Sequence, residues 1–401
     1  MKRLIGLCLA ALLLTGCATG ETLPRETTAA PTAEPAQTLP PETTLPPETT
    51  VPPNPTELLL ESMTLREKVG QLFVVTPEAL SPEEGPVTVC SDALVSGLEE
   101  YPVGGVILFA QNITDPEQLS AFTSDLERAS KLPLFLSVDE EGGAVARLAN
   151  NGAFDLPRYR SVAAVGASSE RSDALKMGYT IGGYLREYGF NMDFAPVADV
   201  NTNPQNPVIG TRAFSSDPEL AAQMADAMAM GLRQQGIIPV FKHFLGHGDT
   251  AEDSHNGLAV SYKTEEDMAR CEWLPFLEAG PGDCIMAGHI AAPELTGDMT
   301  PASLSEPLVT GILRKKLGFR GLVITDSLSM GAITEGFTSA EAALAALEAG
   351  CDILLMPENL PEAFDAVLAA LEEGRISVQW LDETVGRILE YKRDAGILIP
   401  E

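Results

Sequence analysis

Eight short apolar runs, separated by stretches that could form helices, constrain the fold of this chain most strongly. The runs are 69–75, 103–109, 133–138, 191–197, 237–241, 284–287, 321–324 and 351–356. The stretches between and after them include 116–130, 168–188, 217–235, 264–279, 339–349, 361–373 and 378–395. Strands alternating with helices predict a parallel sheet with crossover helices, and eight is the number of strands in a (β/α)8 barrel. A doubly wound open sheet is the alternative.

The positions of the polar residues favour the barrel. They follow the ends of five different runs: Asp139 the third, Asp199 the fourth, Lys242 and His243 the fifth, His289 the sixth and Asp326 the seventh. Barrel enzymes collect their active-site residues at the carboxyl ends of many strands. No GxGxxG follows the first run, so a dinucleotide site has no support.

The first 55 residues are expected to lie outside the folded domain. Lys2 and Arg3 precede an apolar run at 4–14, and the ending LTGC makes Cys17 the expected site of lipid attachment in an exported lipoprotein. Residues 18–55 are rich in Pro, Thr and Glu, which predicts a disordered linker. We therefore expect residues 1–17 to be a leader and 56–401 to be one catalytic domain, held outside the cytoplasm at the cell membrane.

Composition excludes one class of partner. The formal net charge is −31 at pH 7, and no basic stripe offsets it, so nucleic acid would be repelled. The cysteines after Cys17 have no CxxC spacing. Cys284 and Cys351 lie in apolar runs, which predicts reduced thiols in the core rather than a disulfide.

The segment 241–260, FKHFLGHGDTAEDSHNGLAV, holds three of the four histidines. Four interpretations of it compete: a metal site, an acid/base pair formed by Asp253 and His255, ordinary turn residues, and donors to substrate hydroxyls from Lys242 and His243. The histidine spacing matches no common zinc pattern. A carboxylate two residues from an imidazole in a turn can fix its tautomer and favour its charged form.

Three further polar sites follow strands. Asp326 could be a nucleophile or the N-cap of a helix. Asp139 with Arg147, and Arg212 in a loop, could grip a polar ligand by paired hydrogen bonds, or could form surface ion pairs.

Four motifs, taken together, resemble glycoside hydrolase family 3, in its single-domain β-N-acetylglucosaminidase (β-hexosaminidase) branch. They are VDEEGG with Arg147, IGTRAF, KHFLGHGDTAEDSH and TDSLSM, and the resemblance runs from about residue 56 to the C-terminus. It implies a (β/α)8 barrel that needs no metal or cofactor. It also implies the following roles: Asp326 as nucleophile, His255 as acid/base paired with Asp253, and Asp139, Arg147, Arg212, Lys242 and His243 as ligands of the terminal N-acetylglucosamine.

The chain departs from the family pattern at four positions. Glu140 stands where Gln is common, Ala144 where Arg is common, Leu245 where Pro is common, and Ser327 where a second Asp is common. Many relatives in this branch are cytoplasmic, whereas this chain is expected to be exported.

The expected function is an exo-acting, retaining β-N-acetylhexosaminidase acting on a terminal N-acetylglucosamine, with peptidoglycan fragments favoured over chitin-type oligosaccharides. The alternatives are a phosphorylase, another family 3 β-glycosidase, and a catalytically silent sugar-binding lipoprotein. A monomer is favoured.

Overall fold

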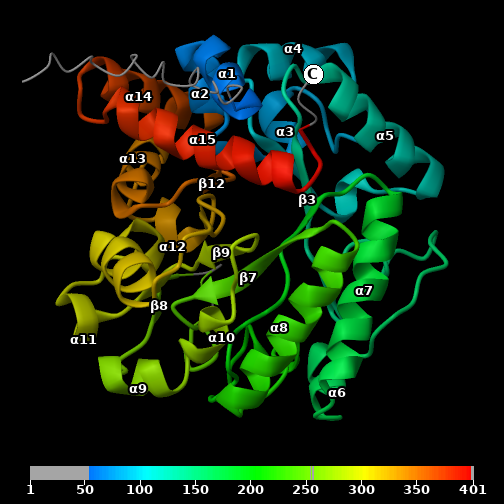
Figure 1. Cartoon of the computed structure of the whole chain (residues 1–401), viewed down its shortest axis with the longest axis vertical. Helices are drawn as coiled ribbons and strands as arrows, with labels where there is room; N and C mark the ends of the chain where they lie inside the picture. The colour runs from blue at the N-terminus through cyan, green and yellow to red at the C-terminus, as the bar shows by residue number, and fades with distance from the viewer. Residues whose placement is uncertain (1–53, 253, 255–256, 399–401) are drawn as a thin grey trace, which may run out of the picture. The chain divides into compact units, whose positions relative to one another are not determined.

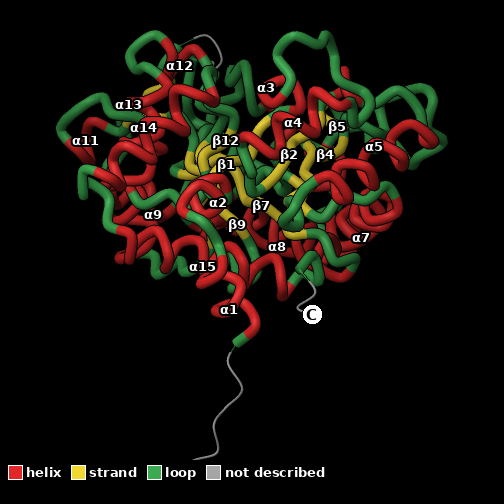
Figure 2. The backbone as a smooth tube through the Cα atoms, turned by 90° about the horizontal axis from the view of Figure 1, so that it is seen from above, coloured by secondary structure: helices red, strands yellow, loops and turns green. Residues whose placement is uncertain are grey.

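An eight-stranded parallel sheet lies at the centre of the molecule and is surrounded by helices (Figures 1 and 2). The computed structural model describes residues 54–398 except 253, 255 and 256, so Cys17, Asp253 and His255 lie outside the described residues. The strands are β1 Phe73–Val75, β2 Gly105–Leu108, β3 Phe135–Val138, β6 Met192–Asp193, β7 Ile238–Phe244, β9 Cys284–Ala287, β11 Leu322–Thr325 and β12 Leu354–Leu355. Each of the eight predicted runs overlaps one of them, although β7 and β11 continue beyond their runs to Phe244 and Thr325.

The order of the strands shows that the sheet curls into a barrel. Neighbouring strands run β11-β9-β7-β6-β3-β2-β1-β12, and all the pairs in this sheet are parallel. A parallel bridge between Ile324 and Ile353 joins the two ends, and the backbone N–H of Thr325 donates to the carbonyl of Ile353 at 3.0 Å. The barrel prediction is therefore confirmed, and the open sheet is excluded.

Helices pack around the barrel, and several short helices and small sheets lie in the loops (Figure 1). The larger helices are α1 Pro55–Ser62, α4 Asp92–Glu100, α5 Pro116–Ala129, α7 Arg171–Glu187, α8 Pro218–Gln234, α13 Ser339–Ala349, α14 Leu360–Glu372 and α15 Val378–Asp394, with a π-helical segment at Pro307–Lys316. The shorter helices are α2 Leu65–Gly70, α3 Pro77–Leu80, α6 Val162–Gly166, α9 Glu265–Arg270, α10 Leu274–Leu277, α11 Pro293–Thr296 and α12 Gly331–Thr334. The small sheets pair β4 Glu140–Gly142 with β5 Val145–Ala146, and β8 Ala259–Val260 with β10 Ile290–Ala291.

Two of the predicted elements differ from the structure. The run 69–75 is only partly a strand, because helix α2 continues to Gly70 and β1 begins at Phe73. The predicted helix 264–279 is divided into α9 and α10, with Pro275 in the first turn of α10. Proline has no N–H for a helical hydrogen bond and clashes with the preceding turn, so it can only stand near a helix start.

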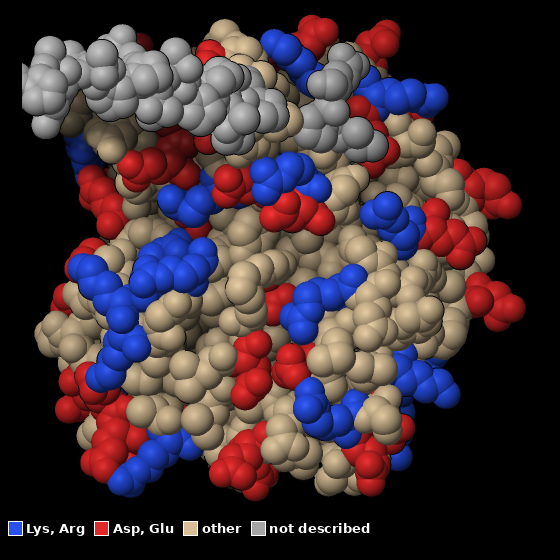
Figure 3. All heavy atoms as spheres, viewed as in Figure 1, with Lys and Arg blue, Asp and Glu red and all other residues tan. Residues whose placement is uncertain are grey.

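The surface of the described region mixes charges of both signs. Figure 3 shows one face on which acidic and basic side chains are interspersed. No described helix combines the length and apolar character that crossing a membrane requires. Cys284 and Cys351 are buried as predicted, and they and the half-buried Cys90 and Cys271 are unpaired.

Lys392 connects the last helix to the amino-terminal ends of three strands. Its Nζ donates to Oε1 of Gln71 at 2.7 Å, to the carbonyl of Gly104 at 2.8 Å and to the carbonyl of Pro133 at 2.7 Å. These three residues lie one or two positions before the starts of β1, β2 and β3. The side chain is fully buried, and burial lowers the pKa of its ammonium group to about 7.

We expect Lys392→Met to lower the free energy of unfolding by about 2–4 kcal/mol, because three buried acceptors lose their donor. The difference in the free energy of unfolding between the wild type and this variant should increase with pH. The unfolded chain holds this proton up to a pKa of about 10.4, whereas the folded chain releases it near 7, so wild-type stability gains from this group between those values. Urea unfolding of both proteins at pH 7 and pH 9 measures this. A difference that shrinks at pH 9 would contradict the assignment.

Candidate active site at the carboxyl ends of the barrel strands

A cavity of about 440 Å³ opens at the carboxyl ends of the strands. It brings together six of the residues predicted from the sequence: Asp139, Arg147, Arg212, Lys242, His243 and Asp326. The other two, Asp253 and His255, lie outside the described residues, but Ser254 between them lines the cavity. The side chains come from the ends of β3, β7 and β11 and from the loops after β3 and β6, which is the arrangement of a barrel active site.

Two carboxylates and three cations form a network on one wall of this cavity. Nζ of Lys242 lies 2.6 Å from Oδ1 of Asp139 and 2.7 Å from Oε1 of Glu141. Arg212 grips Glu141 with two parallel hydrogen bonds, from Nε at 2.8 Å and from Nη2 at 2.7 Å. Arg147 reaches Oδ2 of Asp139 at 3.3 Å. The ligand-gripping prediction fits this geometry better than surface ion pairing, because Lys242 and Glu141 are almost fully buried.

The opposite charges in this network stabilise one another. Burial opposes the charge on Glu141, but Lys242 and Arg212 outweigh it and lower the pKa of the carboxyl group to about 2. Burial also opposes the charge on Lys242, but Asp139 and Glu141 raise its pKa. Glu141 and Lys242 therefore stay charged, and the hydrogen-bonding capacity that remains in the network is available to a polar ligand.

Asp199 contacts His243 on β7 and His247 in the loop after this strand. Its Oδ2 accepts from Nδ1 of His243 at 2.7 Å, and its Oδ1 accepts from the backbone N–H of His247 at 2.6 Å. A carboxylate against Nδ1 requires a proton on that nitrogen, so Nε2 is the ring nitrogen of His243 that remains for other partners. The sequence placed Asp199 at a strand end without giving it a role.

Asp326 follows β11 and lines the cavity. Its Oδ1 accepts from the backbone N–H of Ser327 at 2.8 Å. Burial opposes its charge, but His289 and His243 outweigh that effect and lower its pKa. His289 contacts the carbonyl of Ser327 through Nε2 at 2.7 Å, which fixes the backbone beside Asp326. An ionised carboxylate in such a place can act as a nucleophile, and α12 begins only at Gly331, so Asp326 is not the N-cap of a helix.

Glu141 and Glu140 are adjacent in the chain, but their side chains make different contacts. Glu141 is in the site although the sequence did not single it out. Glu140, noted as a departure from the family pattern, accepts from the backbone N–H groups of Leu148 and Ala149 and from the hydroxyl of Tyr184, each at 2.9 Å. Its carboxylate thus supports the backbone after Arg147 and does not line the cavity.

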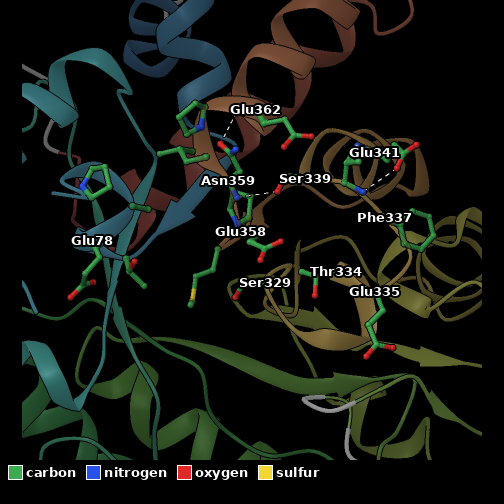
Figure 4. A pocket seen from close by; sticks show the side chains of 18 of the residues that line it. Glu78, Ser329, Thr334, Glu335, Phe337, Ser339, Glu341, Glu358, Asn359 and Glu362 are labelled. Atoms are coloured by element: carbon green, nitrogen blue, oxygen red, sulfur yellow. Dashed lines mark hydrogen bonds between the residues drawn. The ribbon is translucent and has the colours of Figure 1, made fainter. Parts of the chain in front are cut away.

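A wider groove of about 1000 Å³ adjoins the cavity, and Ser329 and Met356 line both. Figure 4 shows the side chains around it. Five glutamates line the groove: Glu78, Glu335, Glu341, Glu358 and Glu362. No Lys or Arg is among its described lining residues. Within the described ranges no group of three or more His, Cys, Asp or Glu side chains is arranged to hold a metal ion.

Comparison with known proteins places this geometry in a family. The chain is 34% identical over 322 residues to beta-hexosaminidase A of Pseudoalteromonas piscicida, which covers 74% of this chain and 54% of that protein. It is 36% identical over 343 residues to the beta-hexosaminidase LpqI of Mycobacterium tuberculosis, which covers 82% of each. The chain thus spans about half the length of the first relative and most of the second.

A solved structure shows the same fold. The glycoside hydrolase family 3 beta-N-acetylglucosaminidase from Paenibacillus sp. str. FPU-7 superposes with a TM-score of 0.77 at 38% identity, over 84% of this chain and 63% of that one. Residues 64–391 match the glycosyl hydrolase family 3 N terminal domain. With this match over most of its length, and with the motif residues gathered in one cavity, the chain belongs to glycoside hydrolase family 3.

Proposed function

We propose that this protein is an exo-acting, retaining β-N-acetylhexosaminidase that removes a terminal β-linked N-acetylglucosamine from peptidoglycan fragments or chitin-type oligosaccharides. The observation that carries the proposal is the cavity itself, in which an ionised Asp326 shares the space with the Asp139, Lys242, Arg212 and Arg147 cluster. Charged donors and acceptors held in fixed positions are suited to several sugar hydroxyls at once. The relatives named as hexosaminidases support the choice of sugar.

The mechanism assigns one residue to each step. The Asp326 carboxylate attacks the anomeric carbon while His255, as imidazolium, gives its proton to the leaving oxygen, so a glycosyl-enzyme ester forms and the glycosidic bond breaks. Water then attacks the same carbon, and His255 takes its proton as the ester breaks. An imidazole with an ordinary pKa of about 6.5 can both give and take a proton near neutral pH. Asp253 stabilises its charged form.

Three alternative functions can be distinguished from this one by experiment. A phosphorylase releases the sugar as its 1-phosphate when phosphate is present, which chromatography of the products detects. Another family 3 β-glycosidase cleaves a β-glucoside in preference to the N-acetyl sugar. A silent sugar-binding protein binds N-acetylglucosamine in calorimetry without turnover.

Asp326→Ala is expected to abolish release of nitrophenol from 4-nitrophenyl N-acetyl-β-glucosaminide by the domain 54–401, because the proposed mechanism forms the ester on Asp326. Loss of the nucleophile costs on the order of 10⁴-fold or more in kcat. Ser329→Ala is the matched control, since Ser329 also lines the cavity but has no role in bond making. If Asp326→Ala retains near-normal turnover, the assignment is wrong.

The acidic groove reverses the order of substrates expected from the sequence, in which peptidoglycan fragments were favoured over chitin-type oligosaccharides. We expect a disaccharide with a neutral N-acetylglucosamine on the leaving side to have a kcat/KM about threefold to tenfold above one with N-acetylmuramic acid there. The muramic carboxylate meets like charges in the groove, and such repulsion is screened by salt. Glu358→Gln should reduce the difference in kcat/KM between the two disaccharides. Glu372→Gln should leave it unchanged, because Glu372 is exposed and lies outside the groove. If the ratio of the two kcat/KM values is the same at ~0.02 M and ~0.5 M salt, the prediction is wrong.

We also propose that a lipid on Cys17 holds the protein at the cell membrane, outside the cytoplasm. The full-length chain should partition into the membrane fraction and be released by detergent, because acyl chains contribute about 0.8 kcal/mol per buried methylene. Cys17→Ala should lose incorporation of labelled fatty acid, while Cys90→Ala should keep it. Labelling of the Cys17→Ala protein at the wild-type level would overturn the proposal.

A further inference from the structure

We propose that Asp199 is a positioning residue, whose carboxylate keeps a proton on Nδ1 of His243 and leaves Nε2 of that ring for a sugar hydroxyl in the catalytic cavity. The inference rests on the proposed function, because His243 is expected to bind the sugar. His243 lines the cavity, whereas Asp199 is 1% exposed and is not among the described lining residues. Asp199 therefore acts on a ligand through the ring that it contacts, and not by touching the ligand itself.

The carboxylate of Asp199 contacts both the ring and the backbone of His243. Its Oδ2 lies 2.7 Å from Nδ1 of the ring, and the backbone N–H of His243 lies 3.3 Å from each of the two oxygens. Its Oδ1 also accepts from the backbone N–H of His247 at 2.6 Å. Because an ionised carboxyl group accepts on both oxygens, one buried side chain can serve the ring and the backbone at the same time.

The contact with Nδ1 decides which nitrogen of the His243 ring carries the proton. An imidazole is a stronger base than a carboxylate, so a proton shared between the two rests on the imidazole. In the neutral ring Nδ1 then donates to Asp199 and Nε2 has a free lone pair, whereas in the charged ring Nε2 carries a proton as well. In both forms Asp199 occupies Nδ1, and Nε2 is the nitrogen that meets a sugar hydroxyl.

The backbone holds Asp199 in place from both sides. Before it in the chain, a parallel bridge joins Val197 to Lys242 on β7. After it, the chain is pressed against the loop that follows β7, since a Cβ on Gly248 would stand 1.8 Å from the carbonyl oxygen of Val200. The segment that carries the carboxylate is therefore fixed against β7 and its loop, and the side chain keeps one position beside the ring.

The ring of His243 is confined on its other sides as well. A Cβ on Gly288 would stand 3.1 Å from Cβ of His243, so the backbone there leaves just enough room for the side chain. The ring of His247 packs edge-on, with the ring centroids 5.9 Å apart and the planes at 76°. Turning the His243 ring over by a half turn would place a carbon atom against Asp199. The contact with Nδ1 therefore selects one ring orientation.

The isosteric substitution Asp199→Asn should reverse the hydrogen bonding of this ring. The amide offers one acceptor and one donor group, whereas the carboxylate offers two acceptors. The backbone N–H of His247 can act only as a donor, so the amide oxygen must face it and the NH₂ group must face Nδ1 of His243. That ring nitrogen then has to accept, and in the neutral ring the proton moves to Nε2.

The first measurement is nitrogen NMR of protein with isotopically labelled histidines, in which the signals of His243 are assigned from their absence in His243→Gln. At about pH 8.5, some two units above the ordinary imidazole pKa of about 6.5, Nδ1 of the wild type should carry a proton, and in Asp199→Asn the proton should be on Nε2. A wild-type Nδ1 without a proton, or a Nδ1 that stays protonated in Asp199→Asn, would overturn the inference.

Asp352→Asn is the matched control. Asp352 is also 1% exposed and also accepts from a backbone N–H, that of Val323 at 2.8 Å, but it lies two residues before β12 and is not among the described lining residues of the cavity. We expect this substitution to lower stability and to leave the protonation of His243 as in the wild type. The same change of protonation in Asp352→Asn would show a general effect of losing a buried carboxylate and would overturn the inference.

The second measurement is a double-mutant cycle on the turnover of 4-nitrophenyl N-acetyl-β-glucosaminide. Asp199→Asn alone should lower kcat/KM about 10–100-fold, because the ring then meets the sugar hydroxyl with the wrong hydrogen-bonding group. In the background of His243→Ala the same substitution should cost less than about threefold, since the ring through which Asp199 acts is absent. Losses that add in full would overturn the inference.

The two proposals fail in different ways. The protonation of Nδ1 is measured without substrate, so it tests the role of Asp199 whatever the activity of the protein. A wild type with a protonated Nδ1 that cleaves no N-acetylglucosaminide would refute the proposed function alone.

Discussion

The pairing of buried charges at the carboxyl ends of β3 and β7 is the constraint on which the rest of the site depends. Lys242 is 2% exposed and Glu141 is 1% exposed, so each charge depends on the opposite charges beside it, Asp139 and Glu141 for Lys242, and Lys242 and Arg212 for Glu141. Removing two ions from water costs several kcal/mol each, and the cost is recovered only when the geometry of the pair is good. Because Asp139 follows β3 and Lys242 lies on β7, with β6 between the two strands, the contact between these side chains at 2.6 Å requires the sheet to curve and the strand ends to lie at the same level.

The barrel could be predicted from the sequence because parallel strands are buried on both faces and therefore appear as continuous apolar runs. The same property explains the error at the first run. Val69 and Leu72 are as buried as the residues of β1, but Val69 belongs to helix α2, and burial alone does not separate the end of a helix from the start of a strand. The break between α9 and α10 could have been predicted from Pro275, which cannot stand in the middle of a helix.

The candidate site could be predicted less completely. Asp326 and Lys242 could be predicted because the active-site residues of a barrel lie at the carboxyl ends of its strands. Glu141 could not be separated from Glu140, because both are glutamates in the same motif. Their side chains point to opposite sides of the short strand β4, as period-two alternation requires, so Glu140 meets Tyr184 while Glu141 meets Arg212. Which side faces the cavity depends on Arg212, which lies far along the chain.

Asp199 holds two histidines of the cavity together. One of its oxygens accepts from the ring of His243, and the other accepts from the backbone N–H of His247. With an exposed fraction of 1%, this carboxylate has little water to replace either partner. A displacement of His243 would therefore move the acceptor on which His247 depends, and through it Ser254. The two histidines therefore share one rigid anchor, because a buried carboxylate must satisfy both oxygens.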